Sequence, residues 1–108
     1  MITTCVTVEL PEALDAEEVR RTFTEGAKLY VNKPGLIRKY YVHSPDLKMF
    51  GGIFLWRDRS FPEAFFTDEW RRAVMDRYPG GVPTVAYLET PIVVDNLAEE
   101  TLAEWGDA

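Results

Sequence analysis

Hydrophobic and polar positions alternate along the first ten residues, and this pattern predicts a strand. The apolar positions have a period of two and are rich in β-branched types, which is typical of a half-buried strand. They comprise Ile2, Val6, Val8 and Leu10, with Thr4 in the same phase. Pro11 follows and ends the predicted strand, because proline cannot donate to a strand ladder.

The pattern then changes to a helical period from about Asp15. Asp15 and Glu18 have the spacing of a capping box, and acidic residues crowd the expected first turn. One apolar stripe follows, formed by Val19, Phe23, Ala27, Tyr30 and Val31. The helix is expected to stop at residues 32–35, where Pro34-Gly35 suits a turn that needs positive φ at its glycine.

Two further strands are predicted next, joined as a hairpin. They span Leu36–Ser44 and Met49–Trp56, with turn-forming residues at Ser44-Pro45-Asp46. Gly51-Gly52 lies inside the second of them. A glycine pair there indicates either a bulge or a place where a backbone or a ligand comes close.

The remainder of the chain predicts a helix, a strand and a short tail. The helix begins at Ser60, with Thr67-Asp68 as a candidate break point, and the last strand covers Val82–Val94. Residues 96–105 have the spacing of a short helix, capped by Asn96 and placing Ala98, Leu102 and Trp105 on one side.

This order, strand, helix, strand, strand, helix, strand, predicts an α+β fold with a ferredoxin-like βαββαβ antiparallel sheet. We expect one such domain over residues 1–96 and an acidic C-terminal tail over residues 97–108. Two helices cover only one face of the sheet, yet both faces of Met49–Trp56 are apolar. The exposed face is therefore predicted to pair with a second copy, giving a homodimer that is a dimeric α+β barrel.

Composition narrows the possible functions. The chain has 108 residues, 46% of them apolar, and a formal net charge of -6. That charge argues against nucleic acid as a partner, and no apolar run is long enough for a membrane span, so a cytoplasmic protein is expected. The single Cys5 and single His43 do not provide a metal-binding spacing, and neither glycine pair has a nucleotide-binding spacing. No metal or cofactor is predicted, although His43 could serve as an axial haem ligand.

The middle of the chain resembles a known family. The residues that carry the resemblance are Lys33-Pro34-Gly35-Leu36, Lys39, Ser44, Gly51-Gly52-Ile53-Phe54-Leu55 and Asp58. This pattern is similar to the YdhR-like mono-oxygenases, which are related to the antibiotic biosynthesis monooxygenases. The resemblance implies the dimeric α+β barrel superfamily, whose members include cofactor-free oxygenases, haem-degrading enzymes and lactone isomerases.

Candidate site residues come mainly from the hairpin. Alternation places Ile37, Lys39, Tyr41 and His43 on one face and Leu36, Arg38, Tyr40 and Val42 on the other, so only one set can line a cavity. We predict His43, Tyr41 and Arg38 as catalytic residues, with His43 as general base. Predicted substrate-binding residues are Tyr40, Phe54, Trp56 and Tyr87.

The function that the resemblance implies is a cofactor-independent monooxygenase. Its substrate would be a small phenol- or anthrone-like aromatic bound in a cavity of the homodimer, deprotonated and then oxidised directly by oxygen. The quinone-forming relatives rely on an asparagine together with a tryptophan. The only asparagines of this chain, Asn32 and Asn96, lie outside the hairpin, which is a departure from that pattern. Two alternatives stay open: a dimeric protein that only binds a small apolar ligand, and an oxygen-independent isomerase.

Overall fold

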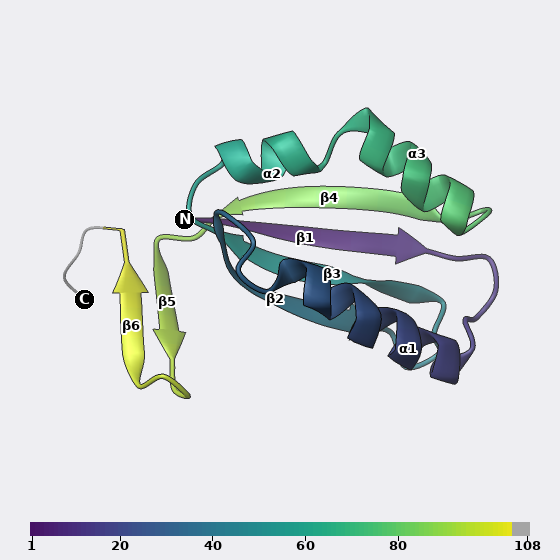
Figure 1. The fold of residues 1–108 in the computed structure, drawn as a ribbon, viewed down its shortest axis with the longest axis horizontal. Coiled ribbons are helices and arrows are strands. Elements are labelled where there is room, and N and C mark those ends of the chain that lie inside the picture. Colours follow the sequence, from purple (N-terminus) through teal and green to yellow (C-terminus); the bar gives the residue numbers. More distant parts are fainter. Residues whose placement is uncertain (105–108) are drawn as a thin grey trace.

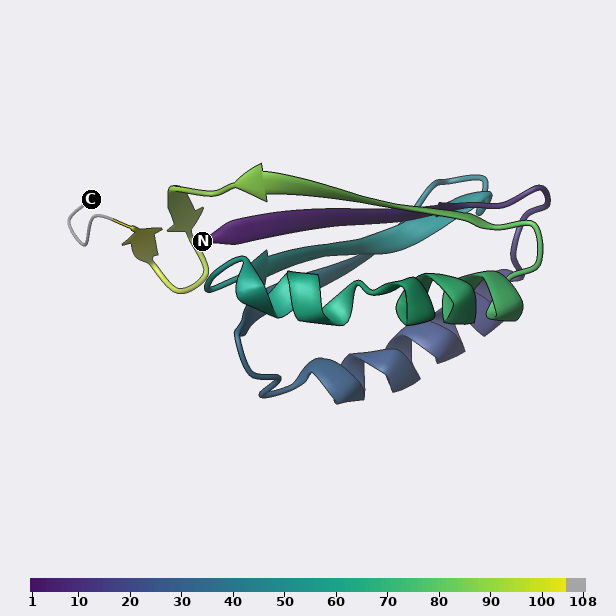
Figure 2. The same ribbon diagram turned by 90° about the horizontal axis from the view of Figure 1, so that it is seen from above.

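The chain folds as a four-stranded antiparallel sheet that carries its helices on one face. The computed structural model describes residues 1–104. Figure 1 shows the arrangement, and the view in Figure 2 shows the helices together on one side of the sheet. The elements are β1 (Ile2–Glu9), α1 (Ala16–Ala27), the 3-10 helix η1 (Lys28–Tyr30), β2 (Leu36–His43), β3 (Met49–Trp56), α2 (Ser60–Phe65), α3 (Asp68–Arg77), β4 (Val82–Glu89), β5 (Ile92–Asp95) and β6 (Glu100–Ala103).

The strand order of the main sheet is β2-β3-β1-β4, with every neighbouring pair antiparallel. This confirms the predicted ferredoxin-like α+β fold. In β1, Ile2, Thr4, Val6 and Val8 are buried, whereas the intervening residues are only partly covered. The alternation in the sequence therefore marks the helix-covered face, as period-two burial requires.

Helices α1 and α3 have side-chain caps, whereas α2, which begins at Ser60 as predicted, has none. The Asp15 carboxylate accepts hydrogen bonds from the backbone N–H groups of Glu17 and Glu18 at 2.9 and 3.2 Å. The candidate break at residues 67 and 68 is confirmed, because α2 ends at Phe65 and the Thr67 hydroxyl accepts from the Trp70 N–H at 3.2 Å to begin α3. Each cap satisfies a donor that has no partner inside the helix.

The turn before β2 is also as expected, but the position of the bulge is not. Gly35 has a φ of 79°, and a Cβ there would lie 2.2 Å from the Phe61 ring, so this turn needs glycine. The register of β2 on β3 shifts between Leu36 and Arg38, whereas pairing across Gly51 and Gly52 is continuous. The bulge therefore lies in β2 rather than at the glycine pair, and it brings Leu36 onto the helix-covered face, against Trp56.

The core of the domain is centred on Trp56. Its side chain is 1% exposed, and its indole N–H donates to the hydroxyl of Thr4, which is fully buried, at 3.0 Å. The Phe54 ring stacks on Trp56 with a centroid distance of 5.5 Å and an interplanar angle of 6°. Phe65 and Phe66 then pack on this pair from the helix layer. A continuous aromatic layer thus joins the helices to the sheet.

The last part of the chain differs from the expectation. The predicted single strand over residues 82–94 is divided at Thr90 and Pro91, and its second part forms β5. Residues 100–103 form β6, which pairs with β5 as a separate two-stranded sheet, where a short helix was expected. Figure 1 shows this hairpin beside the end of the sheet where the N-terminus lies. Trp105, predicted for the same helix, lies outside the described residues.

The face of the sheet that no helix covers has several exposed apolar side chains. It carries Tyr40, Ile53 and Leu88 with 52%, 37% and 56% of their surfaces exposed. Met49, Val42 and Val82 add to the same face. This uncovered face is called the open face below. None of the helices within residues 1–104 is long and apolar enough to cross a membrane.

The hydrogen bond between Trp56 and Thr4 gives a direct stability test. Thr4→Val keeps the side-chain shape but leaves the buried indole N–H without an acceptor, so we expect the free energy of unfolding to fall by about 1–3 kcal/mol. Thr24→Val is the matched control, because the Thr24 hydroxyl donates to the Arg20 carbonyl oxygen at 2.7 Å on the exposed surface of α1. Its expected effect is within about 0.5 kcal/mol. Urea denaturation measures both, and equal losses would contradict the assignment.

Candidate functional site

An apolar pocket lies between the helix-covered face of the sheet and helices α1, α2 and α3. Its volume is about 210 Å³, and we call it the helix–sheet pocket. Its walls are mostly aromatic. The residues used below that line it are Phe23, Tyr30, Lys39, Tyr41, Phe50, Phe54, Phe65 and Arg77.

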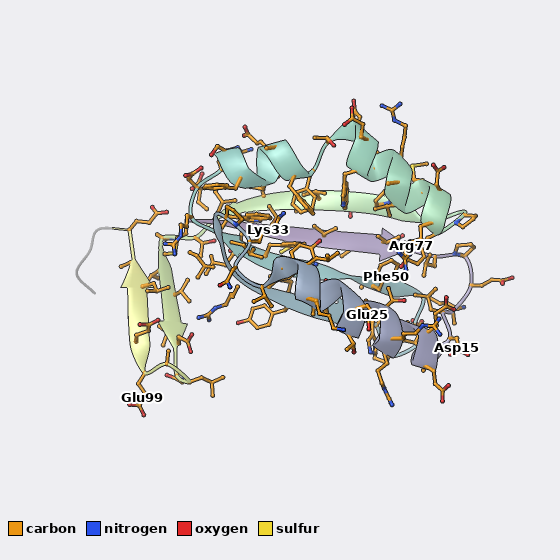
Figure 3. The ribbon with its side chains drawn as sticks, viewed as in Figure 1. Asp15, Glu25, Lys33, Phe50, Arg77 and Glu99 are labelled. Carbon is orange, nitrogen blue, oxygen red and sulfur yellow. The ribbon has the colours of Figure 1, made fainter. Side chains whose placement is uncertain are left out.

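An outer hollow of about 420 Å³ adjoins this pocket near the ends of α1 and α3. Phe23, Phe50 and Arg77 line both spaces. Figure 3 shows Phe50 and Arg77 close together where the two meet. The outer hollow adds the carboxylates of Glu12 and Glu18 to its walls, so it is more polar than the inner pocket. The two spaces together combine an apolar wall with a few polar groups, as in many small-molecule sites.

The most unusual group in the pocket is the amine of Lys39. Its Nζ atom lies 3.5, 3.9 and 4.4 Å from the ring centroids of Tyr30, Tyr41 and Phe54. Burial, and to a lesser extent the positive charge of Lys33, lower the pKa of Lys39 from 10.5 to about 7. Lys39 therefore changes its protonation state near neutral pH, which an exposed lysine does not do.

No carboxylate pairs with this amine among residues 1–104. The ion pairs within these residues involve other cations, namely Arg21, Lys28, Arg38, Arg59 and the N-terminal amine. Ring faces are the partners of Lys39 instead. They attract an ammonium but accept no proton from it, so the neutral amine stays available as a base.

Two tyrosines beside this amine add their hydroxyls to the inner pocket. Burial raises the pKa of Tyr41 to about 12, with Tyr30 adding to the effect, and burial also raises the pKa of Tyr30. Both phenols therefore remain protonated and can donate hydrogen bonds at neutral pH. Tyr41 is held by the Phe23 ring at 4.8 Å between centroids. Gly26 makes room for its hydroxyl, because a Cβ there would lie 2.9 Å from that oxygen.

The glycine pair in β3 explains how a lysine chain fits over the sheet. A Cβ on Gly52 would lie 2.9 Å from Phe54 Cε1 and 3.0 Å from Lys39 Cε. A Cβ on Gly51 would lie 1.8 Å from the backbone oxygen of Val6. The alternative of a close approach was therefore right: side chains crowd Gly52, and the neighbouring strand crowds Gly51.

The structure places the site residues predicted from the sequence on opposite faces of the sheet. Lys39, Tyr41 and His43 share the helix-covered face, and Arg38 and Tyr40 lie on the open face. Tyr41 and Phe54 line the helix–sheet pocket. The catalytic and binding roles assigned to all these side chains stay predictions.

The other predicted residues lie outside that pocket. His43 is exposed at the end of β2, with Nδ1 2.9 Å from the Ser44 carbonyl oxygen, and lines a separate hollow with Val19. Trp56 is buried behind Phe54. Tyr87, on β4, has the Arg59 guanidinium 4.6 Å from its ring centroid. Of the predicted site residues, only Tyr41 and Phe54 therefore contact the Lys39 amine.

Arg38 is bound to the C-terminal hairpin and does not line the helix–sheet pocket. Its guanidinium forms an ion pair with Asp95, whose carboxylate also accepts from the N–H groups of Leu97 and Ala98 at 3.0 and 3.1 Å. The Ala98 N–H and then the Arg38 guanidinium lower the pKa of Asp95. These bonds fix β2 to the β5–β6 turn, which is a structural use of Arg38.

The sequence reasoning missed Lys39 as a functional residue. A lysine in a strand usually marks a solvated face. The available signal was its parity, since it alternates in phase with Tyr41 and His43 and sits beside the glycine pair on the next strand. Within residues 1–104, no group of three His, Cys, Asp or Glu side chains is arranged to hold a metal ion.

Comparison with solved structures supports the fold class. SnoaB, a cofactor-independent oxygenase from Streptomyces nogalater, aligns over 82% of this chain and 91% of its own, with a TM-score of 0.57 and 15% identity. A protein from Caulobacter crescentus CB15, proposed to be an antibiotic biosynthesis monooxygenase, aligns over 82% and 89%, with a TM-score of 0.56 and 20% identity. The chain thus has the ferredoxin-like α+β fold of these proteins.

Comparison of sequences gave no match. No family model matches the chain, and no curated protein matches it in sequence. The narrower resemblance to the YdhR-like family therefore stays a prediction.

The protonation of Lys39 can be measured directly. We expect the NMR signals of its ε-CH2 group to titrate with a midpoint near pH 7, because burial disfavours the ammonium. The variant Lys39→Arg identifies the signals by their disappearance. A midpoint near 10.4, the value of an ordinary lysine, would show that the amine is solvated.

Proposed function

We propose that this protein is a cofactor-independent monooxygenase that oxidises a small electron-rich aromatic compound in the helix–sheet pocket. The observation that carries the proposal is a single amine, Lys39, with a pKa of about 7 inside an aromatic-lined cavity. General bases work best when their pKa lies near the working pH. The likeness in fold to a cofactor-independent oxygenase supports the same reaction class.

The size of the cavity limits the substrate. Small-molecule sites usually enclose about 300–1,000 Å³. The inner pocket, at about 210 Å³, suits one or two fused rings, and the adjoining outer hollow provides space for a third. A phenol, naphthol or anthrone therefore fits, with its reacting end beside Lys39 and its other end toward Arg77.

The first step is removal of a proton. The neutral Lys39 amine takes a proton from the substrate, either from a phenolic O–H or from the CH2 group of an anthrone. The resulting ammonium remains beside the substrate anion, and the Tyr41 hydroxyl donates a hydrogen bond to the oxygen that gains charge. Beside apolar walls these interactions are stronger than they would be in bulk water.

Oxygen then reacts with the electron-rich anion. The electron pair left by the departed proton forms a C–O bond, and O2 is reduced to a peroxide on that carbon. Loss of the second proton of the CH2 group breaks the O–O bond and leaves a carbonyl and water. The sum is CH2 + O2 giving C=O + H2O, with all electrons supplied by the substrate.

The open face supports a homodimer as part of the same proposal. It exposes six large apolar side chains, Tyr40, Val42, Met49, Ile53, Val82 and Leu88, and soluble proteins often cover such side chains by association. Pairing of two open faces leaves one helix–sheet pocket within each subunit. The substrate would then bind inside a subunit and not between the two sheets.

Oxygen uptake tests the reaction. Metal-free protein should consume oxygen only when a phenol, hydroquinone or anthrone is present. Lys39→Met should lower kcat/KM by about 100-fold or more, the typical effect of removing a general base. The wild-type rate should fall as the pH drops below about 7, because protonated Lys39 cannot accept a proton.

The controls separate the two candidate bases. Lys48→Met, at an exposed turn, should leave uptake unchanged. A larger loss in His43→Ala than in Lys39→Met would move the role of base to His43. Substrate turnover without oxygen uptake would instead indicate an isomerase, and saturable binding without turnover would indicate a binding protein.

Sedimentation tests the dimer. Ile53 lies near the middle of the open face, and Ile53→Glu would bury a charge in the proposed interface. The dissociation constant of the dimer should therefore rise by at least ~10-fold, which corresponds to about 1.4 kcal/mol. Met75→Glu on the outer side of α3 is the control and should sediment as the wild type does. A wild-type monomer at micromolar concentration would refute this part of the proposal.

A further inference from the structure

The amine of Lys39 has the surroundings of a nucleophile as well as those of a base. A lysine in a hydrophobic pocket beside another cation is activated because its neutral form is favoured. Here Lys33 is the second cation, with its Nζ atom 4.8 Å from the Phe65 ring centroid. Figure 3 shows Lys33 on the loop before β2, beside the helix layer.

We propose that Lys39 forms an imine with aromatic aldehydes and ketones that enter the helix–sheet pocket. The class of ligand follows from two features of the cavity. Its walls are aromatic, and the lysine that lines it is Lys39. The Lys39 amine contacts three ring faces, and within residues 1–104 it pairs with no carboxylate. This reaction uses the same amine as the proposed oxygenase but needs no oxygen.

The bonds and protons of the reaction balance without an added oxidant or reductant. The Lys39 nitrogen forms a bond to the carbonyl carbon, and one N–H proton moves to the carbonyl oxygen, giving a carbinolamine. The C–O bond then breaks, the second N–H proton leaves with it as water, and a C=N bond remains. The sum is an amine and a carbonyl giving an imine and water.

The same pocket stabilises both ends of this reaction. Tyr41 keeps its proton because burial raises its pKa to about 12, so its hydroxyl can hydrogen-bond the carbonyl oxygen as charge develops there. The protonated imine is a cation, and the faces of Tyr30 and Phe54 that contact the amine would contact it too.

Space for the new bond comes from two glycines. Gly52 lies under the Lys39 chain, and Gly26 faces the Tyr41 hydroxyl, so neither position places a side chain between the amine and the cavity. Lys39 also lines a second hollow at the β2 edge, together with Ala27 and Asn32. The amine is thus reachable without unfolding of the aromatic layer.

Reductive trapping tests the proposal on the intact protein. Benzaldehyde and sodium cyanoborohydride are added at pH 7, which converts any imine into a stable benzylamine, and peptide mapping by mass spectrometry locates it. We expect Lys39 to be labelled at least ~10-fold faster than exposed Lys48. The reason is that about half of an amine with a pKa near 7 is neutral at pH 7, against roughly one in two thousand for an ordinary lysine.

Matched experiments identify the site. Lys39→Arg should lose this adduct while labelling of Lys48 continues at its wild-type rate. An excess of benzyl alcohol, which has the same ring but no carbonyl, should slow labelling of Lys39 only. Labelling of wild-type Lys39 no faster than of Lys48 would overturn the proposal, and this result does not depend on how any variant folds.

The trapping result is independent of the oxygenase assay. It is carried out under nitrogen, where the oxygenase reaction cannot occur, and the uptake assay contains no aldehyde. Labelling with no oxygen uptake would therefore support the imine and refute the oxygenase. Uptake with no labelling would do the reverse.

Discussion

Two positions without side chains at the centre of the sheet, Gly51 and Gly52, determine how the rest of the molecule packs. Any side chain at Gly51 would collide with the backbone of β1, and one at Gly52 would displace Phe54 and the Lys39 chain. The sheet can pair regularly through this point because residue 51 is glycine, and the Lys39 chain can lie over it because residue 52 is glycine. The aromatic layer, the pocket and the position of the amine all follow from that requirement.

Two opposing physical effects set the chemistry of Lys39. Burial favours the neutral amine, and each nearby ring face favours the ammonium by about 0.5–2 kcal/mol. Burial has the larger effect, because the pKa falls to about 7. A pKa near 7 means that both forms of the amine coexist near pH 7. A group in this condition can take up a proton and give it back within one reaction cycle.

The fold was largely predictable because its signals are local. Alternation in residues 2–8 marked β1, and the caps at Asp15 and Thr67 coincide with the observed helix starts. The bulge between Leu36 and Arg38 was not predictable, because it arises from pairing with β3 and not from a residue type. The C-terminal hairpin was missed for a similar reason: Asn96 and its neighbours have helix-capping chemistry, but Asp95 uses the same backbone donors to close a turn.

The site was less predictable than the fold, because it depends on which face the helices cover. His43 was predicted as the base because histidine is the residue type whose unperturbed pKa lies near neutral pH. Whether a lysine is solvated or enclosed by three rings is decided by tertiary packing, which residue types do not reveal. Tyr41 and Phe54 were anticipated since aromatic residues in strands are good candidates for a pocket wall wherever the face lies.

The two faces of the sheet separate two tasks. Lys39 and Tyr41 reach the helix-covered face, while Arg38 and Tyr40, one residue away on the same strand, reach the open face and the C-terminal hairpin. A one-residue shift of β2 would exchange these sets, so the ion pair between Arg38 and Asp95 helps to fix the register that puts the amine in the pocket. Loss of that ion pair would therefore act on the site through strand position, although neither side chain touches the cavity.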